Sequence, residues 1–126
     1  MKKIYYGKAV YNSKEINAVL NVLRNNGLSL VDGKNVKSLE KKVCKIFGKK
    51  YGLMVNSGSS ANLLALAALN FKKGSEIITP NLTFSTTVAP LIQVGFEPVF
   101  CDVMIDKFVP SLEQVTELIT DDIKVI

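Results

Sequence analysis

The fold is decided by a strand, a polar turn and an apolar helix in direct succession, written in the sequence as Val55-Asn56-Ser57-Gly58-Ser59-Ser60-Ala61-Asn62-Leu63-Leu64. A helix that begins near Ser59 or Ser60 leaves its first backbone N–H groups unpaired, and the helix dipole makes that end partly positive. Gly58 lets a ligand approach the backbone, and the serine hydroxyls add donors. The run therefore predicts a phosphate site, with helix capping by Asn56 and the serines as the alternative.

This run differs from the common nucleotide-binding motifs. It lacks the G-x-G-x-x-G pattern of a Rossmann fold and the Gly-Lys-Ser/Thr of a P-loop. A single phosphate group therefore suits it better than a pyrophosphate.

Strands and helices alternate along the rest of the chain. Apolar runs bounded by turn residues predict strands at residues 51–55, 76–79, 98–103 and from 121 onward. Helical spacing of apolar residues predicts helices at residues 13–25, 36–46, 60–71, 83–94 and 111–119. The alternation predicts a parallel sheet with right-handed crossovers, whose ligands bind beyond the carboxyl ends of the strands. The turns after Val55 and Thr79 are thus expected at one edge of the sheet.

Three local features refine the predicted helices. Asn12 and Glu15 have the spacing of a capping pair at the start of the first helix. The helix at 60–71 is apolar on nearly every side, which predicts that it is buried. Pro90 lies inside the helix at 83–94 and predicts a kink there.

Composition indicates one soluble α/β domain or part of one. The chain has 126 residues, of which 48% are hydrophobic, enough for a single core. Its net charge of +5 comes from scattered lysines and a single arginine, without the arginine-rich or aromatic-interleaved stripe of a nucleic-acid-binding surface. No apolar segment has the form of a signal peptide or the length of a membrane span, so a cytoplasmic location without membrane contact is expected.

The two cysteines, Cys44 and Cys101, lie far apart in a chain without histidine. Neither a metal site nor a disulfide is predicted from them, because no cluster of metal-ligating residues accompanies either one. Both are expected to be reduced thiols in the core.

Two further segments come after the serine-rich run, namely Ile77-Ile78-Thr79-Pro80-Asn81-Leu82-Thr83-Phe84-Ser85-Thr86-Thr87-Val88-Ala89-Pro90 and Gly95-Phe96-Glu97-Pro98-Val99-Phe100-Cys101-Asp102-Val103. Together with the serine-rich run, they make residues 10–126 resemble the DegT/DnrJ/EryC1/StrS family of sugar aminotransferases. These enzymes use pyridoxal 5'-phosphate (PLP) on a fold-type I scaffold. The resemblance implies a three-layer α/β domain with a mainly parallel sheet, here truncated. Residues 1–50 would be an N-terminal helical segment, and residues 51–126 the first part of the PLP-binding large domain.

The resemblance also implies roles for individual residues. The cofactor phosphate would be held by Ser57, Gly58, Ser59 and Ser60. Phe84 would stack on the pyridine ring, whereas without the resemblance it would be interpreted as an ordinary core aromatic. Thr86 can reach the same pocket.

Other family features are missing or changed. The family's cofactor-binding aspartate, its cofactor-linking lysine and its small C-terminal domain would all come after Ile126, so no catalytic residue is assigned and the chain is expected to be inactive alone. Asp102 is interpreted as a loop residue. The substrate-pocket segment Leu-Thr-x-Gly-Pro is replaced by residues 30–34, where Ser29 could supply the missing hydroxyl. Four lysines near turns are expected to be solvated: Lys49, Lys50, Lys72 and Lys73.

Three functions remain open. The resemblance implies the N-terminal part of an aminotransferase that acts on a nucleotide-linked keto sugar in polysaccharide biosynthesis, with glutamate as amino donor and a homodimer at full length. The alternative within the family is a 3-dehydrase that uses pyridoxamine 5'-phosphate (PMP) and carries histidine in place of the lysine, because the serine-rich run also resembles that branch. An alternative of another class is a non-catalytic α/β module that binds a phosphorylated ligand.

Overall fold

The computed structural model describes residues 3–25, 30–31 and 33–126. Ser29 and Asp32, which belong to the segment predicted to contact substrate, lie outside the described residues. The chain divides into two compact units, Met1–Met54 and Val55–Ile126.

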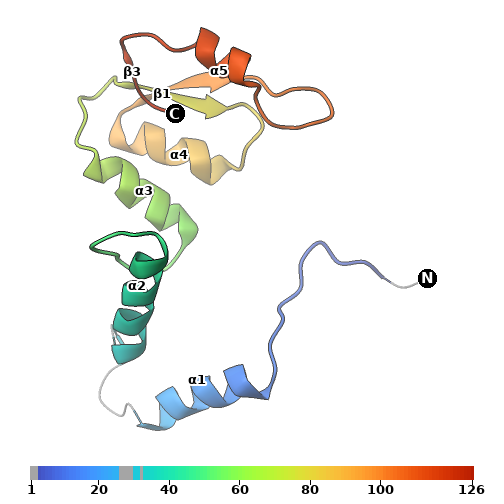
Figure 1. Cartoon of the computed structure of the whole chain (residues 1–126), viewed down its shortest axis with the longest axis vertical. Helices are drawn as coiled ribbons and strands as arrows, with labels where there is room; N and C mark the ends of the chain where they lie inside the picture. The colour runs from blue at the N-terminus through green and yellow to red at the C-terminus, as the bar shows by residue number, and fades with distance from the viewer. Residues whose placement is uncertain (1–2, 26–29, 32) are drawn as a thin grey trace. The chain divides into compact units, whose positions relative to one another are not determined.

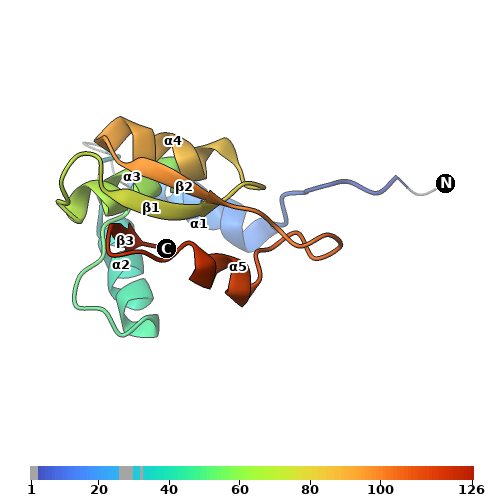
Figure 2. The ribbon, with the colours of Figure 1, turned by 90° about the horizontal axis from the view of Figure 1, so that it is seen from above.

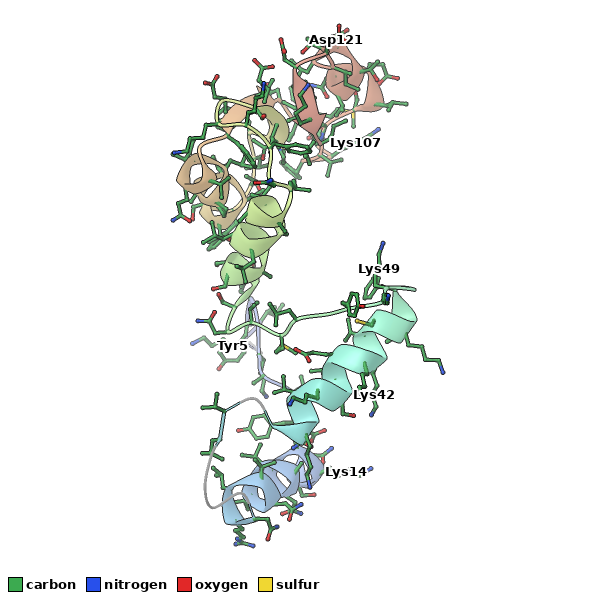
Figure 3. All side chains as sticks on the ribbon, turned by 90° about the vertical axis from the view of Figure 1, so that its left-hand side faces the viewer. Tyr5, Lys14, Lys42, Lys49, Lys107 and Asp121 are labelled. Atoms are coloured by element: carbon green, nitrogen blue, oxygen red, sulfur yellow. The ribbon has the colours of Figure 1, made fainter. Side chains whose placement is uncertain are left out.

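The first unit contains two amphipathic helices, α1 (Ser13–Asn25) and α2 (Lys34–Ile46), as predicted. The capping pair is also present, since the Asn12 N–H donates to Glu15 Oε2 at 2.8 Å. Lysine side chains such as Lys42 on α2 and Lys49 after it extend into solvent (Figure 3).

The strand predicted at residues 51–55 is wrong, because this segment forms no strand in the described chain. The Met54 N–H donates to the side-chain carboxylate of Glu40 at 2.8 Å, so a partner from α2 takes the place of a neighbouring strand. Gly52 lies against the same helix, where an added Cβ would meet Cys44 Sγ at 2.7 Å. The pattern of apolar residues therefore predicted a strand correctly only where a neighbouring strand was available for pairing.

The second unit is built on three parallel strands: β1 (Glu76–Pro80), β2 (Glu97–Cys101) and β3 (Ile123–Val125). The sheet order is β2-β1-β3, which places β1 in the centre. Its register with β2 pairs Glu76 with Glu97 and Pro80 with Cys101. Strands at 76–79 and 98–103 and a final strand after 121 are thereby confirmed, each within a few residues.

Helix α4 (Ser85–Val94) packs against β1 and β2 on one face of this sheet, and α5 (Leu112–Glu117) lies on the other side (Figures 1 and 2). On the α4 side, α3 (Gly58–Ala68) packs against α4 (Figure 1). The predicted three-layer α/β arrangement with a parallel sheet is therefore present in this unit.

The core lies between β1 and α4. Its fully buried members are Ile77, Leu91 and Phe96, and the partly buried side chains around them are Leu66, Val94 and Val125. The helix α4 ends at Gly95, whose left-handed backbone (φ 84°) turns the chain back toward the sheet. Cys101 is buried as predicted, whereas Cys44 is only half-buried, and both thiols are free.

The predicted burial of α3 is wrong. None of its residues is buried, and Leu64 keeps 47% of its surface exposed. The reason is geometric, because a helix that is apolar on every side needs cover on every side. Among its leucines, only Leu66 packs against the core cluster.

Two features are absent from the part of the chain that the structure describes. None of its helices is long and apolar enough to cross a membrane. It also contains no group of three or more side chains suited to a metal ion.

The core predicts a sharp contrast between two neighbours on α4. Leu91→Ala should lower the free energy of unfolding by about 2–5 kcal/mol, because Leu91 is 3% exposed and its removal leaves a cavity. Ile92→Ala is the matched control and should cost less than about 1 kcal/mol, because Ile92 is 60% exposed. Urea denaturation of both variants measures the difference. Equal losses would contradict the assignment of the core.

The cap of α1 predicts a pH dependence. Backbone hydrogen bonds, chiefly from the Asn12 N–H, lower the pKa of Glu15 below its ordinary range. A lowered folded-state pKa means that the carboxylate stabilises α1 above the ordinary glutamate pKa and that this contribution is lost as pH falls. We expect the first turn of α1 to loosen between about pH 5 and pH 3. Glu15→Gln should remove this dependence. An NMR titration tests it, and a Glu15 pKa at or above the ordinary value would contradict it.

Candidate functional site

An open hollow of about 160 Å³ lies between α3 and α4. Its lining residues are Ser59, Ser60 and Leu63 from α3, and Thr86, Ala89, Pro90 and Gln93 from α4. The four from α4 recur at helical spacing and so share one face of that helix. The structure thus brings together three of the residues predicted to bind the cofactor: Ser59, Ser60 and Thr86.

Ser57 caps α3. Its Oγ accepts the backbone N–H of Ser60 at 3.1 Å, and its hydroxyl donates to Ser60 Oγ, also at 3.1 Å. The capping interpretation is therefore correct for Ser57. Since Ser60 Oγ only accepts in this pair, its own hydrogen remains able to donate to a ligand.

Gly58 is the first residue of α3, and the space beside it is open. Within the described chain, an added Cβ would meet nothing within 4 Å, and the residue is helical rather than left-handed. Neither packing nor backbone conformation in these residues therefore requires glycine here. The early N–H groups of a helix have no intrahelical acceptors, so the backbone at Gly58 and Ser59 offers donors beside open space. These features fit a phosphate group.

Phe84 occupies the N-cap position of α4 and is 74% exposed. The interpretation of Phe84 as a core aromatic is therefore wrong for this chain. Its backbone is held in place, because its carbonyl accepts the Thr87 N–H at 2.9 Å. Phe84 does not line the hollow itself, but it precedes Thr86, which does, by two residues.

Thr86 and Asn62 connect the two helices. The side-chain amide of Asn62 donates to the Thr86 carbonyl at 3.3 Å. Within the described residues the Thr86 hydroxyl makes no hydrogen bond, so it can face a ligand. Sequence reasoning missed Asn62, although a lone amide on an otherwise apolar helix could have indicated its role.

Among the described residues, no titratable side chain lines the hollow, so any attraction for an anion comes from backbone N–H groups, hydroxyls and the helix dipole. Asp102 is a loop residue as predicted, since its carboxylate accepts the Val103 N–H at 2.8 Å. Lys72 and Lys73 precede β1 and so lie toward its amino end, away from the loop that carries Phe84. In the part of the chain that the structure describes, the hollow therefore offers binding groups and no acid or base.

Comparison with known proteins places the chain in a family. The model of the DegT/DnrJ/EryC1/StrS aminotransferase family matches residues 10–126. A GDP-4-keto-6-deoxy-D-mannose 3-dehydratase of Escherichia coli O55:H7 is 40% identical over an alignment of 124 residues, which covers 94% of this chain and 31% of the enzyme.

Solved structures show the same relationship. A GDP-4-keto-6-deoxymannose-3-dehydratase with a trapped PLP-glutamate geminal diamine superposes with a TM-score of 0.88 at 36% identity, over 98% of this chain and 33% of that one. A sugar aminotransferase, described as putative, from Streptococcus pneumoniae in its PMP form gives 0.85 at 25% identity, over 98% of this chain and 31% of that one.

The chain spans about a third of the length of each of these relatives. The dehydratases among them are more similar in sequence than the aminotransferase, which favours the alternative interpretation of the sequence over the first. The family predicted from the three motifs is confirmed: the chain belongs to the DegT/DnrJ/EryC1/StrS aminotransferase family.

Proposed function

We propose that this chain is part of the cofactor-binding domain of a PLP- or PMP-dependent dehydratase that removes the 3-hydroxyl of a nucleotide-linked keto sugar. The supporting comparison is the identity of 40% to a dehydratase against 25% to an aminotransferase. We propose glutamate as the amino donor, because a dehydratase of similar fold was trapped with PLP and glutamate.

The single observation that carries the proposal is the open space beside the first turn of α3. A Cβ at Gly58 would meet no described atom within 4 Å, and Ser59 and Ser60 line a hollow next to it. We propose that backbone N–H groups of Gly58 and Ser59 and hydroxyls of Ser59 and Ser60 bind the cofactor phosphate. Ser57 holds the turn in shape by capping it.

The exposed ring of Phe84 is proposed to cover one face of the cofactor ring, with the free hydroxyl of Thr86 beside it. When bound, the cofactor supplies an electron sink for bond cleavage next to its nitrogen. The residues of this chain orient that group and shield it from water on one face, and such orientation can account for a large part of a rate enhancement.

We also propose the wider setting that the sequence suggested. Residues 1–50 would form an N-terminal helical segment and residues 51–126 the first part of the large domain. The whole protein would be a cytoplasmic homodimer serving polysaccharide biosynthesis, and the 126-residue chain alone would bind cofactor without turnover. Exposed apolar residues on both units, such as Leu23 at 55% and Leu64 at 47%, are consistent with surfaces that other protein covers.

The dehydratase proposal predicts the product of the reaction. The complete product of the gene, supplied with PLP, glutamate and GDP-4-keto-6-deoxy-D-mannose, should yield a sugar that lacks the 3-hydroxyl and keeps its keto group. Mass spectrometry distinguishes this product from an amino sugar, which would show transamination instead. Omitting glutamate should stop repeated turnover. Cofactor binding without any change in the sugar would support the non-catalytic module.

Substitutions at the neighbouring residues Ser57 and Gly58 should have different effects on stability. Gly58→Ala should leave the free energy of unfolding unchanged or raise it by up to about 1 kcal/mol, because alanine favours helices and has room here. It should weaken binding of PMP by about tenfold or more, because the methyl group enters the proposed phosphate space.

Ser57→Ala should instead lower the free energy of unfolding by about 1 kcal/mol, because it removes the cap of α3. Chemical denaturation and equilibrium dialysis with PMP measure both quantities. Unchanged PMP affinity in Gly58→Ala would show that the phosphate lies elsewhere.

A further inference from the structure

Few contacts fix the rotation of α3, the helix that carries the proposed phosphate site, about its own axis: among its leucines only Leu66 packs against the core cluster. Apolar side chains surround α3, and none of its residues is buried. Apolar contacts are non-directional, so an all-round apolar helix can pack in several rotational settings of similar energy. The direction in which Ser59 and Ser60 face depends on that rotation, because each helical residue turns the chain by about 100°.

One directional contact removes this freedom. The Asn62 amide donates to the Thr86 carbonyl across 24 residues of sequence, at 3.3 Å. Among the described residues it is the one hydrogen bond that links α3 to another helix or strand. Hydrogen bonds depend strongly on angle, so this bond selects one rotational setting of α3.

One end of this bond, Thr86, lines the hollow, and the other, Asn62, lies on the helix that carries Ser59 and Ser60. Asn62 comes two residues after Ser60 on the same helix, and Thr86 shares the hollow with Ser59 and Ser60. Phe84 precedes Thr86 by two residues, at the start of α4. The bond therefore connects α3, which carries the proposed phosphate-binding groups, to α4, which begins next to Phe84.

We infer that Asn62 is a positioning residue: its amide fixes α3 against α4. The phosphate-binding groups at Gly58–Ser60 and the ring of Phe84 are thereby held at the spacing of one cofactor molecule. This inference rests on the proposed function for the identity of the ligand. Asn62 itself need not touch that ligand.

Loss of the Asn62 bond should affect the affinity for ligands with one point of contact differently from the affinity for ligands with two. Inorganic phosphate needs only the turn at Gly58–Ser60, and pyridoxamine without phosphate needs only the ring site. PMP uses both sites at once. Its higher affinity relative to the ligands with a single point of contact depends on the spacing between the two sites. Loss of the Asn62 bond should therefore weaken binding of PMP while leaving phosphate binding nearly unchanged.

The experiment measures the affinity of the full chain for all three ligands by equilibrium dialysis. PMP is chosen over PLP because its amine does not react with lysine side chains. Asn62→Ala removes the donor without harming the helix, since alanine has the higher helix propensity. It should weaken PMP binding about tenfold and phosphate binding less than about twofold.

Two further variants control the result. Asn62→Gln keeps an amide and should recover part of the PMP affinity. Asn81→Ala removes an amide of the same size from the loop after β1 and should leave the affinity for all three ligands unchanged. Its side chain makes no hydrogen bond within the described residues. A purely structural role for Asn62 would lower the unfolding midpoint and leave the ratio of PMP to phosphate affinity unchanged.

The outcomes separate the two proposals. If the parent chain binds neither phosphate nor PMP, the proposed function fails and the inference fails with it. If the parent binds PMP more tightly than phosphate and Asn62→Ala preserves that ratio, only the inference is wrong. A ratio that falls in Asn62→Ala and recovers in Asn62→Gln supports it.

Discussion

Burial of the central strand β1 is the constraint on which the second unit depends. Ile77, Ile78 and Thr79 are each at most 5% exposed, because β1 has a strand on either side and α4 packs over Ile77. A parallel strand buried in this way fixes the path of the next segment, since the chain must leave the sheet at the strand's carboxyl end and return by a helix. The loop that carries Phe84 is the first segment to leave there.

The two segments of the candidate site, the loop after β1 and the start of α3, are held by different contacts. The loop after β1 is held firmly, because the Asn81 N–H donates to the Cys101 carbonyl at 2.9 Å and the Thr83 hydroxyl donates to Thr87 at 3.0 Å. The start of α3 is held by its own cap at Ser57 and by the Asn62 amide. The loop that carries Phe84 is thus tied to β2, whereas in the described chain α3 has one hydrogen bond to another helix or strand, from Asn62. If the proposed function holds, this difference would make cofactor binding sensitive to the Asn62 hydrogen bond.

Sequence patterns predicted elements that nearby residues stabilise or for which a neighbouring strand was available. They failed where contacts with residues distant in sequence determine the structure. The capping pair at Asn12 and Glu15 depends on residues close in sequence. The strand around Ile77 formed as predicted because β2 and β3 are available to pair with it. The strand expected at 51–55 does not form, because the acceptor for the Met54 N–H is the Glu40 side chain, which no local pattern reveals. Burial of α3 was overestimated for a related reason: periodicity reports how apolar a helix is, not how much protein surrounds it.

In the candidate site, too, local features could be predicted from the sequence and a distant contact could not. Serine, glycine and a helix start are a local signal for a phosphate, and Ser59, Ser60 and Thr86 do share one hollow. Asn62 was missed because its partner lies 24 residues away. A phosphate cradle by itself cannot separate dehydration from transamination, because PLP and PMP carry the same phosphate and the same ring. The residues proposed to hold the phosphate and the ring would contact only groups that the two reactions share, and a common framework of this kind can therefore serve both chemistries.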